Sequence, residues 1–298
     1  MPVENVPERL LIVGASGFVG SRLAMAARAG FTVIRGSRNP PAAGDAVAID
    51  IGGAASVRAA IDQARPTIVI LLAALSDIDR CERERDLAER INFYGAENVA
   101  RECGERGLRL LYTSTDAVFD GTKHIYYEHD EPTPLNWYGQ TKARAERAVR
   151  ELAPSAAIVR LSLVLGRAAG SPGNSYLEKV IGNLKAGNPI VTPTFEFRNP
   201  IDVGTLCEFL LELAPRRDAT GIFHIGASDK MSRYDLARAI AMHLGFDASL
   251  IVPQHEPSPD RAPRGRDDFL VTERLRAVCR TPVPTCQEVI ERACHAVA

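Results

Sequence analysis

The sequence predicts an α/β protein, a doubly wound parallel sheet with a smaller, discontinuous C-terminal lobe. Three observations support this fold class. The short apolar run Arg9–Val13 leads directly into a glycine-rich loop and then a helix. Apolar runs and helical stretches alternate up to residue 161, as expected for strands buried on both faces. Beyond Gly166 the alternation is interrupted by a segment rich in Gly, Ser and Pro.

The first strand, residues 9–13, is followed by Gly14-Ala15-Ser16-Gly17-Phe18-Val19-Gly20 and a helix through Arg28. In this strand–loop–helix context, Gly14 permits a tight turn, Gly17 lets the backbone approach a pyrophosphate, and Gly20 lets the helix pack on the strand. The free N–H groups at the helix start favour phosphate oxygens. The context favours a Rossmann-type dinucleotide site over a glycine turn without ligand. The residues assigned to it are Gly14, Ser16, Gly17, Phe18, Val19 and Gly20.

The second strand, residues 31–34, ends in Arg35-Gly36-Ser37-Arg38. An NAD site usually has a carboxylate about 20 residues past the glycines, and this window has none. We expect Arg35, Ser37 and Arg38 to bind the 2′-phosphate of NADP(H), with NAD(H) as the alternative cofactor. The competing interpretation is that both arginines are solvated loop charges.

The next elements continue the alternation: a helix at 55–65, a strand at 67–72, a long helix at 86–106, and strands at 108–112 and 157–161. Ligands of such sheets bind at the carboxyl ends of the strands. Ala73, Ala74 and the Ser114-Thr115 pair lie at these ends. Asp50 and Ile51 would lie beside an adenine ring, although a plain loop is an equally good interpretation.

Tyr138 and Lys142 form a Y-x-x-x-K pair at the start of a predicted helix that continues to Leu152. Residues four apart share one helix face, so a phenol and an ammonium point the same way. A nearby cation stabilises phenolate, which lowers the pKa of a tyrosine and makes it an acid/base catalyst. Alone, such a pair is more often two ordinary surface residues. The glycine loop and the polar cluster 113–116 favour catalysis here.

The C-terminal part has less regular patterns. We expect a loop at 168–174, a helix at 176–186, an irregular stretch at 189–200, a helix at 203–213 and a strand at 221–225 that returns to the main sheet. A helix at 233–244, a loop at 253–268 and a helix at about 286–295 follow. The predicted dinucleotide-binding domain is 1–166 with a return segment at about 200–226. The predicted substrate-binding lobe is 167–199 and 227–298.

Composition excludes several functional classes. The formal net charge of −1 gives no electrostatic footprint for nucleic acid, and no apolar run is long enough to span a bilayer. The six cysteines lack C-x-x-C spacing, so we expect reduced thiols, no metal and a cytoplasmic protein.

These motifs together resemble the extended, sugar-nucleotide-modifying branch of the short-chain dehydrogenase/reductase superfamily, and within it the dTDP-4-dehydrorhamnose reductases. The resemblance covers most of residues 8–166. It is carried by Gly14 to Gly20, Ala73-Ala74-Leu75-Ser76-Asp77 with Cys81-Glu82, Asn92 with Gly95, Ser114-Thr115-Asp116-Ala117-Val118-Phe119-Asp120-Gly121, Tyr127-Glu128 with Asp130, Pro134-Leu135-Asn136, and Tyr138 to Lys142. Related 4,6-dehydratases carry a Glu where this chain has Ala117, which favours carbonyl reduction.

The resemblance implies that Thr115, Tyr138 and Lys142 are catalytic, with Lys142 holding the nicotinamide ribose and lowering the pKa of Tyr138. It assigns cofactor contacts to Ala73, Ala74, Leu75, Thr113, Tyr138 and Lys142. The predicted substrate contacts are Ser76, Asp116, Trp137, Arg261 and Arg264. Asp116 could equally cap the turn before Gly121. Departures from the family pattern fall at Leu163, at residues 194–200 and at Trp137.

The leading hypothesis is an NADP-dependent reductase of a 4-keto-6-deoxy sugar nucleotide. Arg261, Arg264 and Arg266 would clamp the diphosphate, unless they form a solvated basic loop. One alternative is a nucleotide-sugar epimerase. Another is a non-catalytic, NADP-binding subunit like the regulatory subunit of methionine adenosyltransferase. A homodimer is expected from the resemblance alone.

Overall fold

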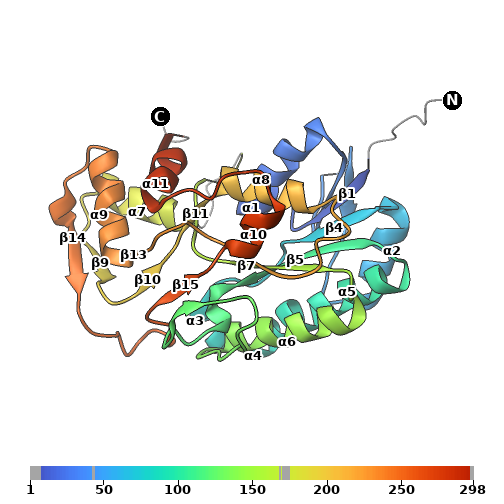
Figure 1. Cartoon of the computed structure of the whole chain (residues 1–298), viewed down its shortest axis with the longest axis horizontal. Helices are drawn as coiled ribbons and strands as arrows, with labels where there is room; N and C mark the ends of the chain where they lie inside the picture. Colours follow the sequence, from blue (N-terminus) through green and yellow to red (C-terminus); the bar gives the residue numbers. More distant parts are fainter. Residues whose placement is uncertain (1–7, 42–43, 168, 170–174, 296–298) are drawn as a thin grey trace.

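The protein is built around one seven-stranded parallel sheet, here seen in a computed structural model that describes residues 8–41, 44–167, 169 and 175–295 (Figure 1). The strands, in spatial order, are β12 (Gly221–Ile225), β7 (Ala157–Leu161), β5 (Arg109–Thr115), β4 (Ile68–Leu71), β1 (Arg9–Val13), β2 (Thr32–Ser37) and β3 (Ala46–Ala48). The order reverses between β1 and β4, where doubly wound sheets bind their ligands. The predicted Rossmann-type fold is confirmed, including the return strand at 221–225.

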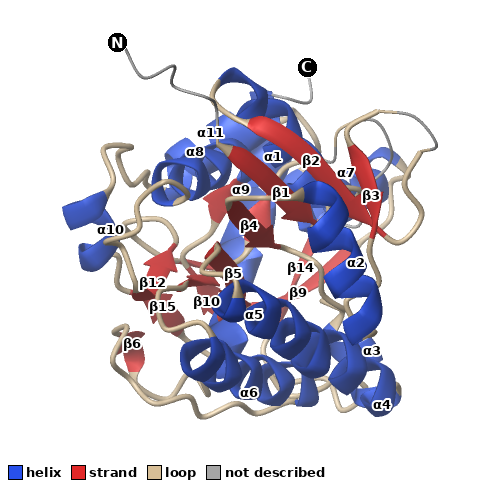
Figure 2. Cartoon of the chain, turned by 90° about the vertical axis from the view of Figure 1, so that its right-hand side faces the viewer, coloured by secondary structure: helices blue, strands red, loops and turns tan. Residues whose placement is uncertain are grey.

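Helices cover both faces of this sheet (Figures 1 and 2). Helices α2 (Ala54–Ala64), α5 (Gly95–Glu105) and α6 (Trp137–Leu152) lie on one face, and α1 (Phe18–Ala26) and α8 (Val203–Leu213) lie on the other. Alternate side chains of β1 point to opposite faces of the sheet: Leu10 and Ile12 pack toward α1 and α8, whereas Leu11 and Val13 pack toward α2 and α5. This two-sided burial explains why the strands are continuously apolar.

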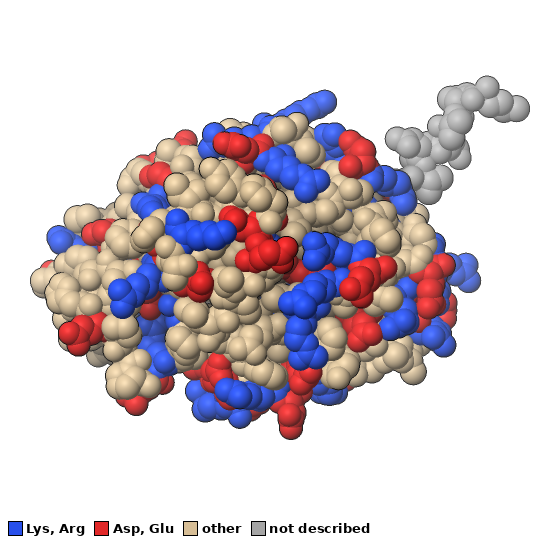
Figure 3. Space-filling model, turned by 60° about the horizontal axis from the view of Figure 1, so that its bottom comes forward, with Lys and Arg blue, Asp and Glu red and all other residues tan. Residues whose placement is uncertain are grey.

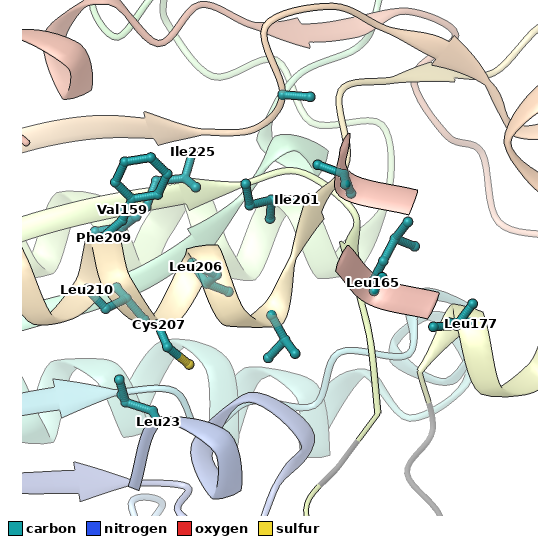
Figure 4. Packing of buried hydrophobic residues seen from close by; sticks show 14 of the residues in the cluster. Leu23, Val159, Leu165, Leu177, Ile201, Leu206, Cys207, Phe209, Leu210 and Ile225 are labelled. Atoms are coloured by element: carbon teal, nitrogen blue, oxygen red, sulfur yellow. The ribbon is translucent and has the colours of Figure 1, made fainter. Parts of the chain in front are cut away.

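Helix α8 links the C-terminal part to the main core. Its apolar side chains pack between the sheet and α1, with Leu206, Phe209 and Leu210 beside Val159, Ile225 and Leu23 (Figure 4). Each fully buried Leu or Phe contributes about 2 kcal/mol to folding. The cluster continues through Leu165, Leu177 and Ile201, so the two parts of the chain share one core.

The C-terminal segments form small two-stranded sheets. They pair β8 (Val164–Leu165) with β11 (Ile201–Asp202), β9 (Ile190–Pro193) with β14 (Ile251–Gln254), β10 (Phe197–Arg198) with β13 (Met231–Ser232), and β6 (His124–Tyr126) with β15 (Asp268–Leu270). Helices α7 (Tyr176–Lys185), α9 (Arg233–His243), α10 (Glu273–Val278) and α11 (Cys286–His295) accompany them. The stretch at 189–200, predicted to be irregular, therefore holds two short strands.

Two other predictions need correction. The long helix predicted at 86–106 is three joined segments: α4 (Arg85–Ala88), a π-helical turn at Glu89–Tyr94, and α5. The first helix, predicted to extend through Arg28, is α-helical only to Ala26, and a 3₁₀ turn follows from Ala27 to Ala29. Helices α3 (Ile78–Arg83) and α10 and strands β3, β6, β8, β11, β13, β14 and β15 were not predicted. The loop predicted at 168–174 lies, except for residue 169, outside the described residues.

The surface shows charges of both signs interspersed over the face in Figure 3, in line with the net charge of −1. Among the helices of the described residues, none combines the length and apolar character needed to cross a bilayer.

Candidate active site

A cavity of about 440 Å³ lies at the carboxyl ends of the sheet strands. Its lining combines the glycine loop, the end of β5, the start of α6 and residues from the C-terminal segments. Among the predicted site residues, those that line it are Gly14, Gly17, Phe18, Val19, Gly20, Ala74, Ser76, Thr113, Thr115, Asp116, Tyr138, Lys142 and Arg264. The fold thus brings together side chains from both the predicted cofactor side and the predicted substrate side.

The glycine loop has the close packing expected of a phosphate-binding turn. Gly14 has φ +95°, and its N–H donates to the carbonyl of Gly36 at 2.9 Å. A methyl group on Gly20 would overlap the carbonyl of Gly14 and lie 2.9 Å from Cα of Ala15, so only glycine fits. At Gly17 a methyl group would approach only the Gly14 carbonyl, at 3.3 Å.

Helix α1 begins immediately after this loop, with Gly17 as its N-cap and no side-chain hydrogen bond at that cap. The N–H groups of a first helical turn lack partners within the helix. Here they belong to Phe18, Val19 and Gly20, which line the cavity. An open backbone at Gly17 and uncapped amides fit the pyrophosphate of a dinucleotide.

Tyr138 and Lys142 lie one turn apart near the start of α6 and both line the cavity. Asn136 caps the helix by accepting a hydrogen bond from the Gly139 N–H at 2.8 Å. Lys142 is 2 % exposed; its Nζ donates to the carbonyl of Thr113 at 2.7 Å and lies 4.1 Å from the centre of the Tyr112 ring. The shared face expected from the four-residue spacing is present.

The electrostatics of this pair differ from the expectation. Burial raises the pKa of Tyr138, a hydrogen bond with Thr115 opposes the rise, and Asp116 adds to it. Burial lowers the pKa of Lys142 to about 7, against the opposing charge of Glu146. The pKa of Tyr138 is therefore raised in this geometry, contrary to the prediction that Lys142 lowers it, because burial is the largest influence on the phenol.

The end of β5 presents three consecutive hydroxyl groups with different partners. Thr113 Oγ1 donates to the carbonyl of Leu71 at 2.9 Å, and Ser114 Oγ donates to Glu146 Oε1 at 2.5 Å. Thr115 Oγ1 donates to Asp116 Oδ1 at 3.0 Å. Glu146 is in turn paired with Arg160 at 2.8 Å, and both side chains are almost completely buried. The strand end is thus fixed by a buried charge pair behind it.

Asn92 fixes the loop after β4, and it lies in the π-helical turn. Its amide accepts from the N–H of Leu75 at 2.8 Å and donates to the carbonyl of Leu75 at 3.0 Å and to Thr141 Oγ1 at 3.3 Å. Such π-helical turns are frequent at functional sites. The turn directs Asn92 inward, where it ties the loop containing Ala74 and Ser76 to the helix of Tyr138.

The residues predicted to bind the ribose and adenine lie outside the described lining of the cavity. Arg35 is paired with Asp45 at 2.9 Å, whereas Arg38 is exposed and Ser37 half-buried. Asp50 accepts from the N–H of Gly52 at 3.0 Å and lies 3.5 Å from Arg90. The neighbouring Ile51 is buried in the second core cluster, Ser16 is exposed, and Ala73 donates from its N–H to the Val13 carbonyl.

On the predicted substrate side, Trp137 and Arg261 are not among the described residues that line the cavity. The indole N–H of Trp137 donates to the carbonyl of Arg85 at 3.1 Å, and Arg261 pairs with Glu196 at 3.4 Å. Arg264 does line it and pairs with Asp79 at 2.8 Å. Arg266 lies over the ring of Phe195, at 5.8 Å from its centre.

Three charged residues that line the cavity were not predicted: Glu196, Arg198 and Arg233. Two of them fall in the stretch 194–200, whose departure from the family pattern was the available signal. Arg233 begins α9 and lies 4.2 Å from the centre of the Tyr176 ring. Its Nε is buried without a hydrogen-bond partner, and no carboxylate among the described residues pairs with it.

Comparison with known proteins identifies the family. Residues 8–298 match the family described as RmlD substrate binding domain, so the chain belongs to it. A dTDP-4-keto-6-deoxy-D-glucose reductase of Streptomyces niveus is 32% identical over 83% of this chain and 82% of that protein. The methionine adenosyltransferase 2 subunit beta of Xenopus tropicalis is 29% identical over 91% of this chain and 82% of that protein.

The fold is also shared with solved structures. A dTDP-4-dehydrorhamnose reductase from Bacillus anthracis in complex with NADP superposes with a TM-score of 0.86 at 27% identity, covering 97% of this chain and 99% of that one. The resemblance inferred from the sequence motifs is confirmed.

Proposed function

We propose that this member of the RmlD substrate binding domain family is an NADPH-dependent reductase of a 4-keto-6-deoxy sugar nucleotide, with Tyr138 as the proton donor. The chain is an NAD(P)-dependent oxidoreductase; its substrate and proton donor are the proposed part. The observation that carries the proposal is that Thr115, Tyr138 and Lys142 line the same cavity as the glycine loop. A cytoplasmic location and a homodimeric state stay predictions from the sequence.

The chemistry assigns one task to each side chain. A bound nicotinamide supplies hydride to the carbonyl carbon of the substrate. Tyr138 donates its phenolic proton to the carbonyl oxygen, and its raised pKa keeps that proton in place until the oxygen becomes basic. Thr115, at the end of β5, orients the same oxygen. Lys142, fixed by the Thr113 carbonyl, has two further N–H donors for the ribose of the cofactor.

Arginines that line the cavity are suited to bind the diphosphate of a sugar nucleotide. Arg198 and Arg264 line the cavity, but each is already paired with a carboxylate. Arg233 lacks such a partner among the described residues, and its buried Nε is without a hydrogen bond. We therefore assign the main diphosphate contact to Arg233, with Arg264 as a second contact from the same cavity lining, in place of the clamp of Arg261, Arg264 and Arg266 expected from the sequence.

The preference for NADPH rests on the second strand. Arg38 is exposed, and no ion pair engages it among the described residues, so it is available to a 2′-phosphate. Arg35 is held by Asp45 and would have to share that contact. The absence of a carboxylate within residues 35–38 removes the usual partner of the NAD ribose.

The experiment is a screen of 4-keto-6-deoxy sugar nucleotides with NADPH, followed by the loss of its absorbance. We expect stoichiometric oxidation of NADPH and a loss of at least about a hundredfold in kcat for Tyr138→Phe. An epimerase would convert its sugar without net consumption of NADPH. That outcome, or unchanged turnover in Tyr138→Phe, would count against the proposal.

The relationship to methionine adenosyltransferase subunit beta supports a second candidate, a non-catalytic partner of another enzyme. The intact set of Thr115, Tyr138 and Lys142 at the cavity favours catalysis. A stoichiometric complex with an enzyme partner, combined with no turnover of any keto sugar nucleotide, would favour the second candidate.

A further inference from the structure

Arg198 lies at the contact between the C-terminal segments and the end of β5. It is 8 % exposed, and its Nε lies 3.2 Å from Asp116 Oδ2. Its Nη2 lies 2.9 Å from Asp268 Oδ2 and donates to the carbonyl of Gly265 at 3.0 Å, while Nη1 donates to the carbonyl of Phe197 at 2.7 Å. The guanidinium is therefore held in place on several sides and is not free to follow a substrate.

Asp116, the partner of Arg198, is also the hydrogen-bond acceptor of Thr115. The Thr115 hydroxyl donates to Asp116 Oδ1 at 3.0 Å and accepts from the Ala117 N–H at 3.1 Å. It also forms a hydrogen bond with the phenol of Tyr138. A hydroxyl group has a single proton to donate. While that proton is on Asp116, Thr115 cannot donate to Tyr138 or to the oxygen of a ketone.

The strength of Asp116 as an acceptor depends on Arg198. A buried carboxylate without a cation attracts a hydroxyl proton strongly, whereas a cation on its other oxygen withdraws charge from the hydrogen bond. Asp116 and Arg198 are both buried, so solvent screens this interaction little. Burial alone would lower the pKa of Arg198, but the surrounding carboxylates Asp268, Asp116, Glu196 and Asp267 together raise it, so the guanidinium stays charged.

We propose that Arg198 is a positioning residue: it neutralises Asp116 and thereby releases the Thr115 hydroxyl proton toward the reacting oxygen. Asp268 holds the guanidinium from the opposite side, which keeps it on Asp116. The inference rests on the proposed function, because the released hydrogen bond serves the ketone oxygen. It also gives the C-terminal segments a role in catalysis, since Arg198 belongs to β10 and Asp268 to β15.

The kinetic test measures the effect of Arg198→Met in two backgrounds. In the otherwise unchanged enzyme we expect kcat to fall by about ten- to a hundredfold, the value of one charge-assisted hydrogen bond, with KM changed less than about threefold. In the Asp116→Asn background the same substitution should change kcat by less than about threefold. Lys230→Met, which removes one of the two partners of Asp267, the other being His124, without touching Asp116, is the matched control, with an expected change below about twofold. Equal losses from Arg198→Met in both backgrounds would overturn the proposal.

A second readout does not need turnover. The Thr115 hydroxyl proton can be followed by NMR in threonine-labelled protein without substrate, where Arg198→Met should shift it downfield as its bond to Asp116 strengthens. An unchanged resonance would contradict the proposal even if the proposed function failed. If Arg198→Met does not fold, Arg198→Met with Asp268→Asn replaces it in both measurements, since this pair removes one of the two carboxylates that Arg198 balances.

Discussion

Replacing Gly20 by alanine tests whether the loop before α1 is shaped by backbone contact. The added methyl group would lie 2.8 Å from the carbonyl carbon of Gly14 and 2.9 Å from Cα of Ala15, well inside the ordinary 3.5–4.0 Å separation. Both neighbours are backbone atoms, which cannot rotate away as a side chain would. We expect a loss of about 3 kcal/mol of unfolding free energy, at the upper end for overpacking, and a melting temperature lower by roughly 5 °C.

The same displacement moves the first amides of α1 away from their phosphate-binding positions. NADPH affinity, measured by fluorescence titration, should fall at least about tenfold, which corresponds to 1.4 kcal/mol. Gly182→Ala in α7 is the matched control, because no atom lies within 4 Å of its added methyl group. It should keep NADPH affinity and gain up to about 1 kcal/mol of stability. A Gly20→Ala variant with unchanged melting temperature and NADPH affinity would refute this reasoning.

Arg233→Ala should raise KM for the sugar nucleotide about tenfold, since it removes a charge-assisted contact to the diphosphate; Arg261→Ala, whose side chain lies outside the described lining of the cavity, should raise it less than about threefold. An equal effect of both substitutions would contradict the assignment. Arg38→Ala should lower kcat/KM for NADPH about tenfold and leave that for NADH within about twofold; a parallel loss with both cofactors would exclude 2′-phosphate recognition. His224→Gln should reduce the acid sensitivity of folding, because burial and then the Arg160 charge lower the pKa of His224 to about 3. In the unchanged protein, His224 of the unfolded chain binds a proton below pH about 6.5, whereas His224 of the folded state does not. The free energy of unfolding is therefore highest above that pH and decreases as the pH falls toward 3. His224→Gln should lower the pH dependence of the unfolding free energy by about 1.4 kcal/mol per pH unit, measured by urea unfolding between about pH 6.5 and 4.5. An unchanged pH dependence would contradict the lowered pKa of His224.

The sequence predicted the central sheet well because its physical signal is local. Strands buried on both faces are short apolar runs, and β7 and β12 match their predicted bounds at both ends. The glycine loop was predicted equally well, because its strand, glycines and helix are adjacent in the chain. By contrast β6 and β15 contain three residues each and pair residues 124–126 with 268–270. Their pairing depends on tertiary contact, which local patterns do not record.

At the candidate site, local sequence patterns again predicted neighbouring residues but not long-range contacts. Four-residue spacing correctly placed Tyr138 and Lys142 on one face, whereas Trp137 is the next residue to Tyr138 and lies about 100° away around the helix. Its exclusion from the cavity lining follows from that rotation. The pairing of Arg198 with Asp116 and Asp268 joins residues about 70 to 80 positions apart, so no local pattern indicates it. Burial likewise reversed the expected pKa shift of Tyr138.

The central claim is that this cavity transfers hydride to a sugar ketone while Tyr138 protonates its oxygen. The most direct measurement uses NADPH deuterated on the transferred position of its nicotinamide, a 4-keto-6-deoxy sugar nucleotide, and NMR of the product. We predict one deuterium on the carbon that carried the ketone, formed at least about a hundredfold more slowly by Tyr138→Phe. Product without deuterium at that carbon, or an equal rate in the Phe variant, would contradict the account.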